Sequence, residues 1–192
     1  MRQLLDELFA EGRALDQREP DHAKRRLNLE PETAALVAML LRLGRRRRVL
    51  EIGTSNGYGT IWLAWAVDAG GGRVVSIDRA TEKQAQADAN LRRAGLRHIV
   101  DLVSGDATAV VANLPGPFDA VVFDADRRSA PDQLRLLLPK LAPDALLLAD
   151  NALSHSDEIA PYLAAVAALP DVDHLVVPTG KGLSLAHRPP PA

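Results

Sequence analysis

Short apolar runs alternate with longer amphipathic stretches along most of the chain. Apolar runs of about four to eight residues, bounded by glycine or polar residues, are typical of buried parallel strands. Strands are predicted at Val49–Ile52, Arg73–Ile77, Ile99–Val103, Phe118–Phe123, Ala145–Ala149, Val172–Val177 and Gly182–Ala186. Helices are predicted between them at Tyr58–Val67, Thr81–Ala94, Pro131–Leu141 and Ser156–Leu169. This alternation predicts one α/β domain over residues 1–192, with a mostly parallel sheet and helices on both faces.

Two further helices are predicted before the first strand. The first carries an apolar stripe at helical spacing, formed by Leu4, Leu5, Leu8, Phe9 and Leu15. This stripe either packs on the domain or forms a contact in a homodimer. The second helix, Glu32–Leu43, follows Pro31, and its predicted buried face is Leu36, Met39, Leu40 and Leu43. We expect residues 1–45 to cover the functional site and residues 46–187 to form the core.

A glycine-rich loop follows the first predicted strand. Gly53, Gly57 and Gly59 have the spacing G-x-x-x-G-x-G, and Glu51 precedes them. Glycine has no Cβ, so such a loop can turn sharply and approach a ligand closely. The dinucleotide-binding fingerprint is G-x-G-x-x-G, which counts against an NAD-dependent dehydrogenase. The wider first loop favours a nucleoside cofactor without a pyrophosphate, such as S-adenosylmethionine.

Polar residues stand at the carboxyl end of each of the first five predicted strands. In doubly wound sheets this edge binds the ligand. Asp78 follows the second strand, 19 residues after Gly59, at a distance that suits a carboxylate bound to ribose hydroxyls. A single aspartate there is more often a helix cap or turn residue. Several polar strand ends on one rim indicate a binding site, and the others are Ser104 to Ala107, Asp124 to Arg127, and Asp150 with Asn151.

Composition excludes several classes of protein. The chain has no cysteine, which excludes disulfides and thiolate metal sites. Its formal net charge of −2 gives no overall attraction to nucleic acid or to a membrane, and the basic run Arg45 to Arg48 is interpreted as a solvated loop. No apolar run approaches the roughly 20 residues of a membrane span, and no signal peptide is seen. We therefore expect a cytoplasmic protein.

Six stretches of the sequence together resemble a known family. They are VLEIGTSNGYGT, VVSIDRATEKQAQADANLRRAGL, SGDA, FDAVVFDAD with LLLADN, and GKGLSLA. The chain, from about Leu27 to Ala186, resembles the small metal-dependent O-methyltransferases of the catechol and caffeoyl-CoA type. The resemblance implies a Rossmann-like methyltransferase fold, a seven-stranded sheet with its last strand antiparallel, and S-adenosylmethionine as cofactor. The implied substrate is a small hydroxylated molecule, catechol-like or phenolic, and a homodimer is the implied assembly.

The resemblance also implies a cofactor-binding set. Glu51, Gly53, Ser55 and Gly59 are expected at the methionine end, Asp78 at the ribose, and Asp106 with Ala107 near the adenine. Leu27 and Leu29 are expected to cover the cofactor. The set is completed by Gly57, Arg79, Gly105 and Asp124.

Asp124, Asp150 and Asn151 match the residues that bind Mg²⁺ in the family. The residues themselves agree with this. The fourth and fifth strands are expected to be neighbours, about 4.8 Å apart, so their ends bring two carboxylates and an amide oxygen to one point. Hard oxygen ligands suit Mg²⁺, which would bind the substrate hydroxyl and lower its pKa.

The chain departs from the family pattern after the first metal aspartate. A lysine usual in the family is Arg127 here, and the asparagine and tyrosine that follow it are Ser129 and Ala130, so the substrate pocket must differ. A guanidinium stays protonated, so Arg127 is expected to stabilise an oxyanion, to hold an acidic substrate or to form a surface salt bridge. These departures leave open a metal-independent N-methyltransferase or a cofactor-binding module.

The histidines match no zinc motif. His155, four residues after Asn151, is the predicted acceptor of the substrate proton, with helix capping or simple exposure as the alternative. The remaining histidines are expected to be structural or exposed, and they are His22, His98, His174 and His187.

Overall fold

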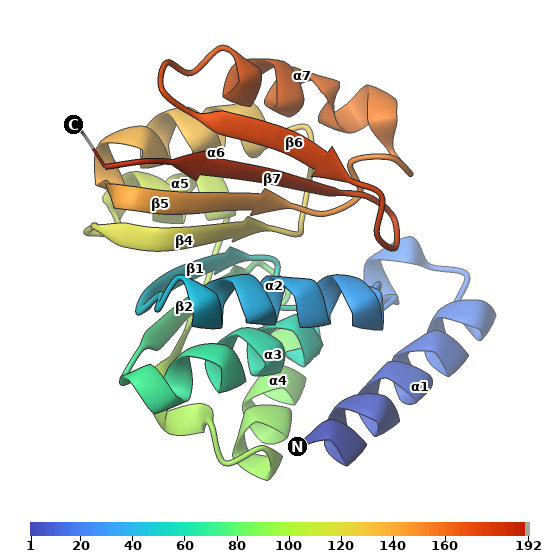
Figure 1. Cartoon of the computed structure of the whole chain (residues 1–192). Helices are drawn as coiled ribbons and strands as arrows, with labels where there is room; N and C mark the ends of the chain where they lie inside the picture. The colour runs from blue at the N-terminus through green and yellow to red at the C-terminus, as the bar shows by residue number, and fades with distance from the viewer. Residues whose placement is uncertain (191–192) are drawn as a thin grey trace.

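A computed structural model describes residues 1–190, and within them seven strands form one mixed sheet in the order β3-β2-β1-β4-β5-β7-β6 (Figure 1). Neighbouring strands from β3 to β5 are parallel, and β7 is antiparallel to both β5 and β6. The predicted antiparallel last strand is therefore confirmed. The strands are β1 (Arg48–Ile52), β2 (Arg73–Asp78), β3 (Val100–Ser104), β4 (Phe118–Phe123), β5 (Leu141–Ala149), β6 (Asp173–Val177) and β7 (Leu183–Arg188).

Helices cover both faces of the sheet, as expected (Figure 1). One face carries α2 (Pro31–Leu43), α3 (Tyr58–Val67) and α4 (Thr81–Arg93), and α1 (Arg2–Arg18) packs outside α3. The other face carries α5 (Ala107–Asn113), α6 (Ala130–Leu137) and α7 (Ser156–Ala167). Successive strand residues point to opposite faces, so Ala120 and Val122 of β4 join the first apolar cluster while Val121 and Phe123 join the second. No helix within residues 1–190 is long and apolar enough to cross a membrane.

Two segments differ from the sequence prediction between the fourth and fifth strands. The helix expected to reach Leu141 ends at Leu137, and β5 begins at Leu141, four residues before the predicted start. Pro139 lies in the intervening 3₁₀ turn, where its missing N–H cannot continue an α-helix.

The sequence also assigned no bounds to α5, which lies between β3 and β4. This helix begins after Asp106, whose carboxylate accepts a hydrogen bond from the Ala109 amide at 3.0 Å.

The apolar stripe of α1 packs on the domain. Leu5 and Leu8 are buried, and the Phe9 ring lies 5.7 Å from the Tyr58 ring, centroid to centroid. Of the two interpretations of this stripe, packing is the one that the structure supports.

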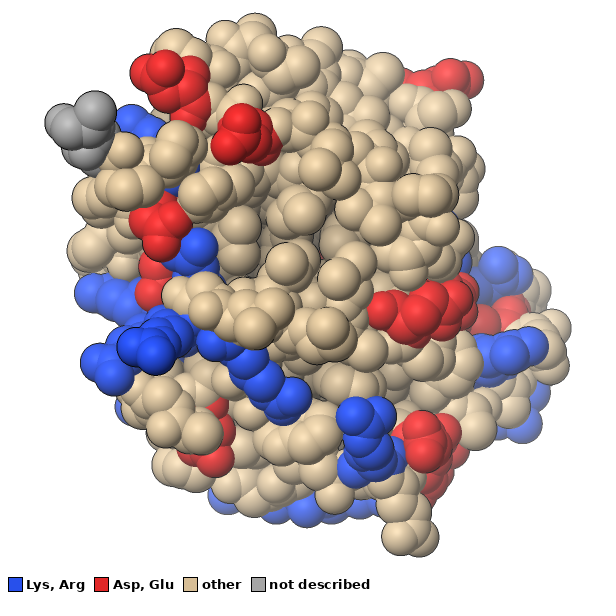
Figure 2. Space-filling model, in the orientation of Figure 1, with Lys and Arg blue, Asp and Glu red and all other residues tan. Residues whose placement is uncertain are grey.

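The predicted buried face of α2 is wrong at two of its four residues, while Leu36 and Leu40 are partly buried against the core as predicted. Met39 and Leu43 are 54% and 78% exposed, whereas Ala34 and Ala38 are fully buried. The small alanines let α2 approach α3 closely, and an offset of one residue rotates a helix by about 100°. Figure 2 shows a broad face with few charges over α2 and β7. The homodimer that the family resemblance implies stays a prediction.

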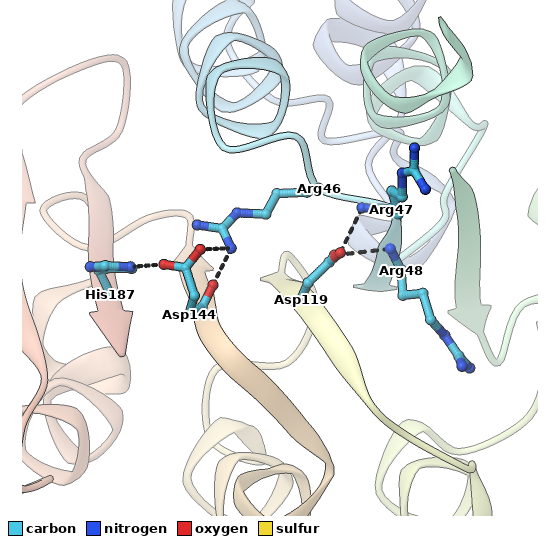
Figure 3. A network of polar contacts seen from close by, with 6 residues as sticks. All are labelled: Arg46, Arg47, Arg48, Asp119, Asp144 and His187. Carbon is cyan, nitrogen blue, oxygen red and sulfur yellow. Dashed lines mark hydrogen bonds and ion pairs between the residues drawn. The ribbon is translucent and has the colours of Figure 1, made fainter. Parts of the chain in front are cut away.

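The basic run before β1 is not simply a solvated loop, which corrects the expectation for Arg46. This side chain is only 8% exposed, and it donates hydrogen bonds to the carbonyl and, at 3.0 Å, to the carboxylate of Asp144 (Figure 3). His187 of β7 contacts the other carboxylate oxygen. The Asp119 carboxylate accepts the amides of Arg47 and Arg48 at 2.6 and 2.9 Å.

These contacts fasten β1 to β4, β5 and β7 at their edge opposite the polar strand ends. His187 is therefore structural, as predicted. His174 forms a hydrogen bond with Ser184 and His98 is exposed, so both also agree with the prediction of a structural or exposed role. The hydrogen bonds from His187 and Arg46 lower the pKa of Asp144.

We expect Asp144→Asn to lower the free energy of unfolding by about 1–3 kcal/mol, because a buried guanidinium loses its charged partner. Asparagine tolerates the left-handed φ of +67° at this position, so backbone strain does not contribute. Urea unfolding measures the change. The matched control is Asp132→Asn, at an exposed carboxylate on α6, which should stay within about 0.5 kcal/mol of the wild type. Equal losses in both variants would contradict a structural role for the Arg46 contacts.

Candidate active site

A cleft lies at the carboxyl ends of β1, β2, β4 and β5, and it consists of two neighbouring cavities. The smaller cavity, about 110 Å³, reaches Gly105, Asp106 and Ala107. The larger, about 430 Å³, reaches the loops after β4 and β5. Both cavities are bordered by Gly53, Asp78, Arg79, Ala125 and Asp126, so together they form one continuous cleft.

The glycine loop sits directly against the end of β4. Gly53 has φ +111°, and a Cβ there would clash with the carbonyl oxygen of Asp124. Gly57 has φ +84°, and its Cβ would lie 2.9 Å from Ala87 of α4. In α3, a Cβ on Gly59 would lie 2.9 Å from a carboxylate oxygen of Glu51. Gly53 thus lines the cleft, whereas Gly57 lets the loop pack against α4 and Gly59 lets α3 pack against Glu51 of β1.

Glu51, just before the glycine loop, holds the elements around the loop together. Its buried carboxylate accepts hydrogen bonds from Thr60 Oγ1 and Ser76 Oγ, both at 2.5 Å, which joins β1 to α3 and β2. Burial raises the pKa of Glu51 to about 7, against the opposing effect of the two hydroxyls. Leu29 is also buried here, beside Gly59. Neither residue lines the cleft, although sequence reasoning placed both at the cofactor.

The raised pKa of Glu51 predicts a pH-dependent stability. The unfolded glutamate titrates near 4.5 and the folded one near 7, so the folded state holds the proton more tightly between these values. Its contribution to stability is full below pH 4.5 and is lost as the pH rises through 7, for a total of about 3 kcal/mol. Glu51→Gln should remove this component. The fall in the free energy of unfolding from pH 5 to pH 8, measured with urea, should be smaller in the variant than in the wild type. An equal fall in both proteins would contradict the assignment.

Asp78, at the end of β2, holds the glycine loop in place. Its two carboxylate oxygens accept the amides of Ser55 and Ala80, each at 2.8 Å. It borders both cavities, as does the neighbouring Arg79. Asp106 both caps α5 and lines the smaller cavity, so the capping and the binding interpretations coexist at this residue.

A strap formed by residues 21–29 closes one side of the cleft, to the right in Figure 1. The Asp16 carboxylate of α1 accepts the amides of Arg26 and Leu27, at 2.6 and 2.9 Å. Ser55 Oγ donates to the Arg26 carbonyl at 2.7 Å, which joins the strap to the glycine loop. His22 and Leu27 line the larger cavity. Sequence reasoning missed Asp16, since one carboxylate on the polar side of a helix gives no signal of its partner.

Of the three predicted metal ligands, Asp124 and Asn151 line the larger cavity, and Asp150 lies buried next to Asn151. Asp150 is 4% exposed, and its Oδ1 atom has no hydrogen-bond partner within the described chain. Its Oδ2 atom accepts a hydrogen bond from Asn151 Nδ2 at 2.8 Å, and Asn151 Oδ1 accepts one from Ser154 at 3.1 Å. Burial raises the pKa of both Asp124 and Asp150, and the charge of Asp150 raises that of Asp124 further.

This arrangement fits a divalent cation. A buried carboxylate oxygen without a partner, beside a second carboxyl group, is costly unless a cation compensates it. Carboxylate and amide oxygens are the hard ligands that Mg²⁺ prefers. Within residues 1–190, no cluster of three or more His, Cys, Asp or Glu side chains is placed to hold a metal, so the site would have two carboxylates and one amide.

Two predicted catalytic residues and one unforeseen lysine complete the wall of the larger cavity. Arg127 lies 2.9 Å from Glu158 Oε2 through both Nε and Nη2, so it forms the ion pair that the sequence left as one interpretation. His155 precedes α7, and its Nδ1 atom is 2.9 Å from Ser154 Oγ. Lys181 lies on the turn between β6 and β7. The sequence did not predict it as a site residue, because its position between two glycines does not indicate that it faces the cleft.

Comparisons with known proteins agree with this geometry. The family described as "Methyltransferase domain" matches residues 50–152. The catechol O-methyltransferase of Niastella koreensis is 30% identical over 66% of the chain, and that of Mycobacterium tuberculosis is 33% identical over 67%. The chain spans 59% and 58% of the lengths of these two relatives. The O-methyltransferase TomG from Streptomyces achromogenes, solved in complex with S-adenosylmethionine, is 28% identical with a TM-score of 0.81, over 97% of this chain and 89% of TomG.

Proposed function

Because the chain belongs to the S-adenosylmethionine-dependent O-methyltransferases of the catechol and caffeoyl-CoA family, we propose that it methylates a hydroxyl group of a small, catechol-like or phenolic molecule with the help of a divalent cation. One observation carries this proposal. The glycine loop supported by Asp78 lines the same cleft as the carboxylate of Asp124, which lies near the buried carboxylate of Asp150.

The residues of the smaller cavity and the glycine loop would bind the cofactor. Asp78 can accept the ribose hydroxyls in addition to its two amides, because a carboxylate offers about four lone-pair positions. Gly105, Asp106 and Ala107 would surround the adenine, and Leu27 of the strap would exclude water from above. S-adenosylmethionine supplies an activated methyl group, which leaves sulfur for the acceptor oxygen as that oxygen gives up its proton.

The residues of the larger cavity would bind the acceptor. Asp124, Asp150 and Asn151 would hold the cation, which when bound lowers the pKa of a hydroxyl that it contacts. His155 is the proposed acceptor of the hydroxyl proton. Arg127 keeps its charge at neutral pH, so its proposed role is to stabilise negative charge on the acceptor.

A methyl-transfer assay tests the proposal. The chain is incubated with S-adenosylmethionine labelled in its methyl group and with catechol, a flavonoid, a hydroxycinnamate or 3,4-dimethoxyaniline, the last of which offers only an amine. We expect label on the oxygen of a hydroxylated acceptor, loss of transfer with EDTA, and recovery with Mg²⁺. Label found only on the amine, and unaffected by EDTA, would instead identify a metal-independent N-methyltransferase.

A further inference from the structure

The larger cavity of the cleft is rich in fixed positive charge. Among the described residues that line it, none is Phe, Tyr or Trp, so stacking on an aromatic wall cannot select the acceptor. Its lysine and arginine side chains outnumber its carboxylates, and they are Arg26, Arg79, Lys83, Arg127 and Lys181 against Asp78, Asp124 and Asp126. Such a cavity favours an anionic ligand.

Two of these cations belong to the acceptor end. Arg26, Arg79 and Lys83 come from the strap, the end of β2 and α4, on the side of the predicted cofactor residues. Arg127 and Lys181 come from the loop after β4 and the β6–β7 turn. Both side chains line the larger cavity together with Asp124 and Asn151, so both cations face the centre where the acceptor hydroxyl would bind.

The backbone holds Lys181 firmly beside the acceptor site. Its carbonyl accepts the amides of Leu153 and Ser154, at 3.0 and 3.1 Å. The Gly182 carbonyl accepts the amide of Ala152 at 2.9 Å. The turn between β6 and β7 is thus bonded to the loop that follows Asn151, and this keeps Lys181 at the same wall as Asn151.

Of the two cations, Lys181 is the less committed to a protein partner. Its ammonium lies 3.6 Å from Glu30, longer than the roughly 2.7–2.9 Å of a charge-assisted hydrogen bond. Both side chains are about one-third exposed, so water screens this pair. Arg127, in contrast, approaches Glu158 at 2.9 Å through two nitrogen atoms. An anionic ligand would therefore compete for Lys181 more easily than for Arg127.

We propose that Lys181 binds a carboxylate of the methyl acceptor, so that the substrate is a hydroxylated aromatic acid and not a neutral catechol. This inference rests on the proposed O-methyltransferase function. Lys181 is then a residue that determines specificity and takes no part in the transfer itself.

Three matched acceptors test the proposal. They are 3,4-dihydroxybenzoate, its neutral methyl ester and the cationic 3,4-dihydroxybenzylamine. In the wild type, kcat/KM should be about tenfold or more higher for the acid than for the ester, as expected for a charge-assisted hydrogen bond. Lys181→Ala should remove this preference, mainly through KM, and Lys181→Glu should favour the amine. Arg135→Ala, at an exposed cation of α6 outside the cleft, should keep the wild-type preference.

A binding measurement separates this inference from the proposed function. Calorimetry of the three acceptors with protein saturated by S-adenosylhomocysteine should show tighter binding of the acid, lost in Lys181→Ala. If the ester binds and reacts as well as the acid, or if the preference survives in Lys181→Ala, the inference about Lys181 is wrong while O-methyl transfer stands. If no acceptor is methylated, the proposed function fails, and the calorimetric preference still decides whether Lys181 binds a carboxylate.

Discussion

Asp150→Ala should abolish the binding of a divalent cation and lower cation-dependent methyl transfer by more than about a hundredfold, because metal stabilisation of a developing oxyanion is worth several kcal/mol. The buried Oδ1 atom of Asp150 has no partner within the described chain, which suits an oxygen that awaits a cation. Affinity for S-adenosylhomocysteine should change little, since the cofactor residues lie on β1, β2 and the loop after β3. Calorimetric titration with Mn²⁺ measures the loss independently of activity.

The nearby exposed carboxylate of Asp157 provides the control. Asp157→Ala removes the same charge from the first turn of α7 and should leave cation binding and transfer unchanged. In metal-free buffer near pH 7, Asp150→Ala should unfold at the same urea concentration as the wild type or at a higher one. This is expected because burial raises the pKa values of Asp124 and Asp150, so that ionising them costs stability, and the variant lacks one of these two groups. Unchanged Mn²⁺ affinity in Asp150→Ala would exclude the proposed ligand set.

Asp78→Ala should weaken the binding of S-adenosylhomocysteine by about a hundredfold or more. Two hydrogen bonds from ribose hydroxyls to a carboxylate are each worth about 1.5–3 kcal/mol, and 1.4 kcal/mol corresponds to a factor of ten. The same carboxylate also accepts the amides of Ser55 and Ala80, so its loss should loosen the glycine loop as well. Both effects act in the same direction on affinity.

Asp78→Asn separates these two effects. The asparagine amide keeps one oxygen that can accept a hydrogen bond but lacks the charge. The affinity of Asp78→Asn for S-adenosylhomocysteine should therefore lie between those of the wild type and Asp78→Ala. Calorimetry with S-adenosylhomocysteine ranks the three proteins. Wild-type affinity in Asp78→Ala would remove Asp78 from the cofactor site and with it the placement of the ribose.

The features that the sequence predicted well are local ones. Apolar runs such as Val49–Ile52 and Phe118–Phe123 have the length and composition of buried strands, and their ends lie where the structure has them, within a residue. Gly53 and Gly57 have positive φ angles, which their spacing in a loop before a helix already indicated. The polar strand ends converge because parallel strands share one carboxyl edge.

The features that the sequence missed depend on partners far along the chain. Half of the predicted α2 face, Met39 and Leu43, is exposed, because the side that approaches α3 closely carries small alanines, a condition that α2 alone does not reveal. Arg46 is buried because Asp144, 98 residues away, accepts its hydrogen bonds. Asp16 holds the strap and Lys181 lines the cleft only because of where the fold places α1 and the β6–β7 turn. Contacts between residues far apart in the chain cannot be predicted from a local sequence pattern.

A crystal structure of the protein with S-adenosylhomocysteine and Mn²⁺ would test the central claim most directly, because the anomalous signal of manganese locates the cation. We predict cofactor density along the glycine loop, with its ribose at Asp78, and a manganese peak bound by Asp124, Asp150 and Asn151. Density for the cofactor outside this cleft, or a cleft that holds the cofactor while manganese binds elsewhere or not at all, would contradict the proposed site.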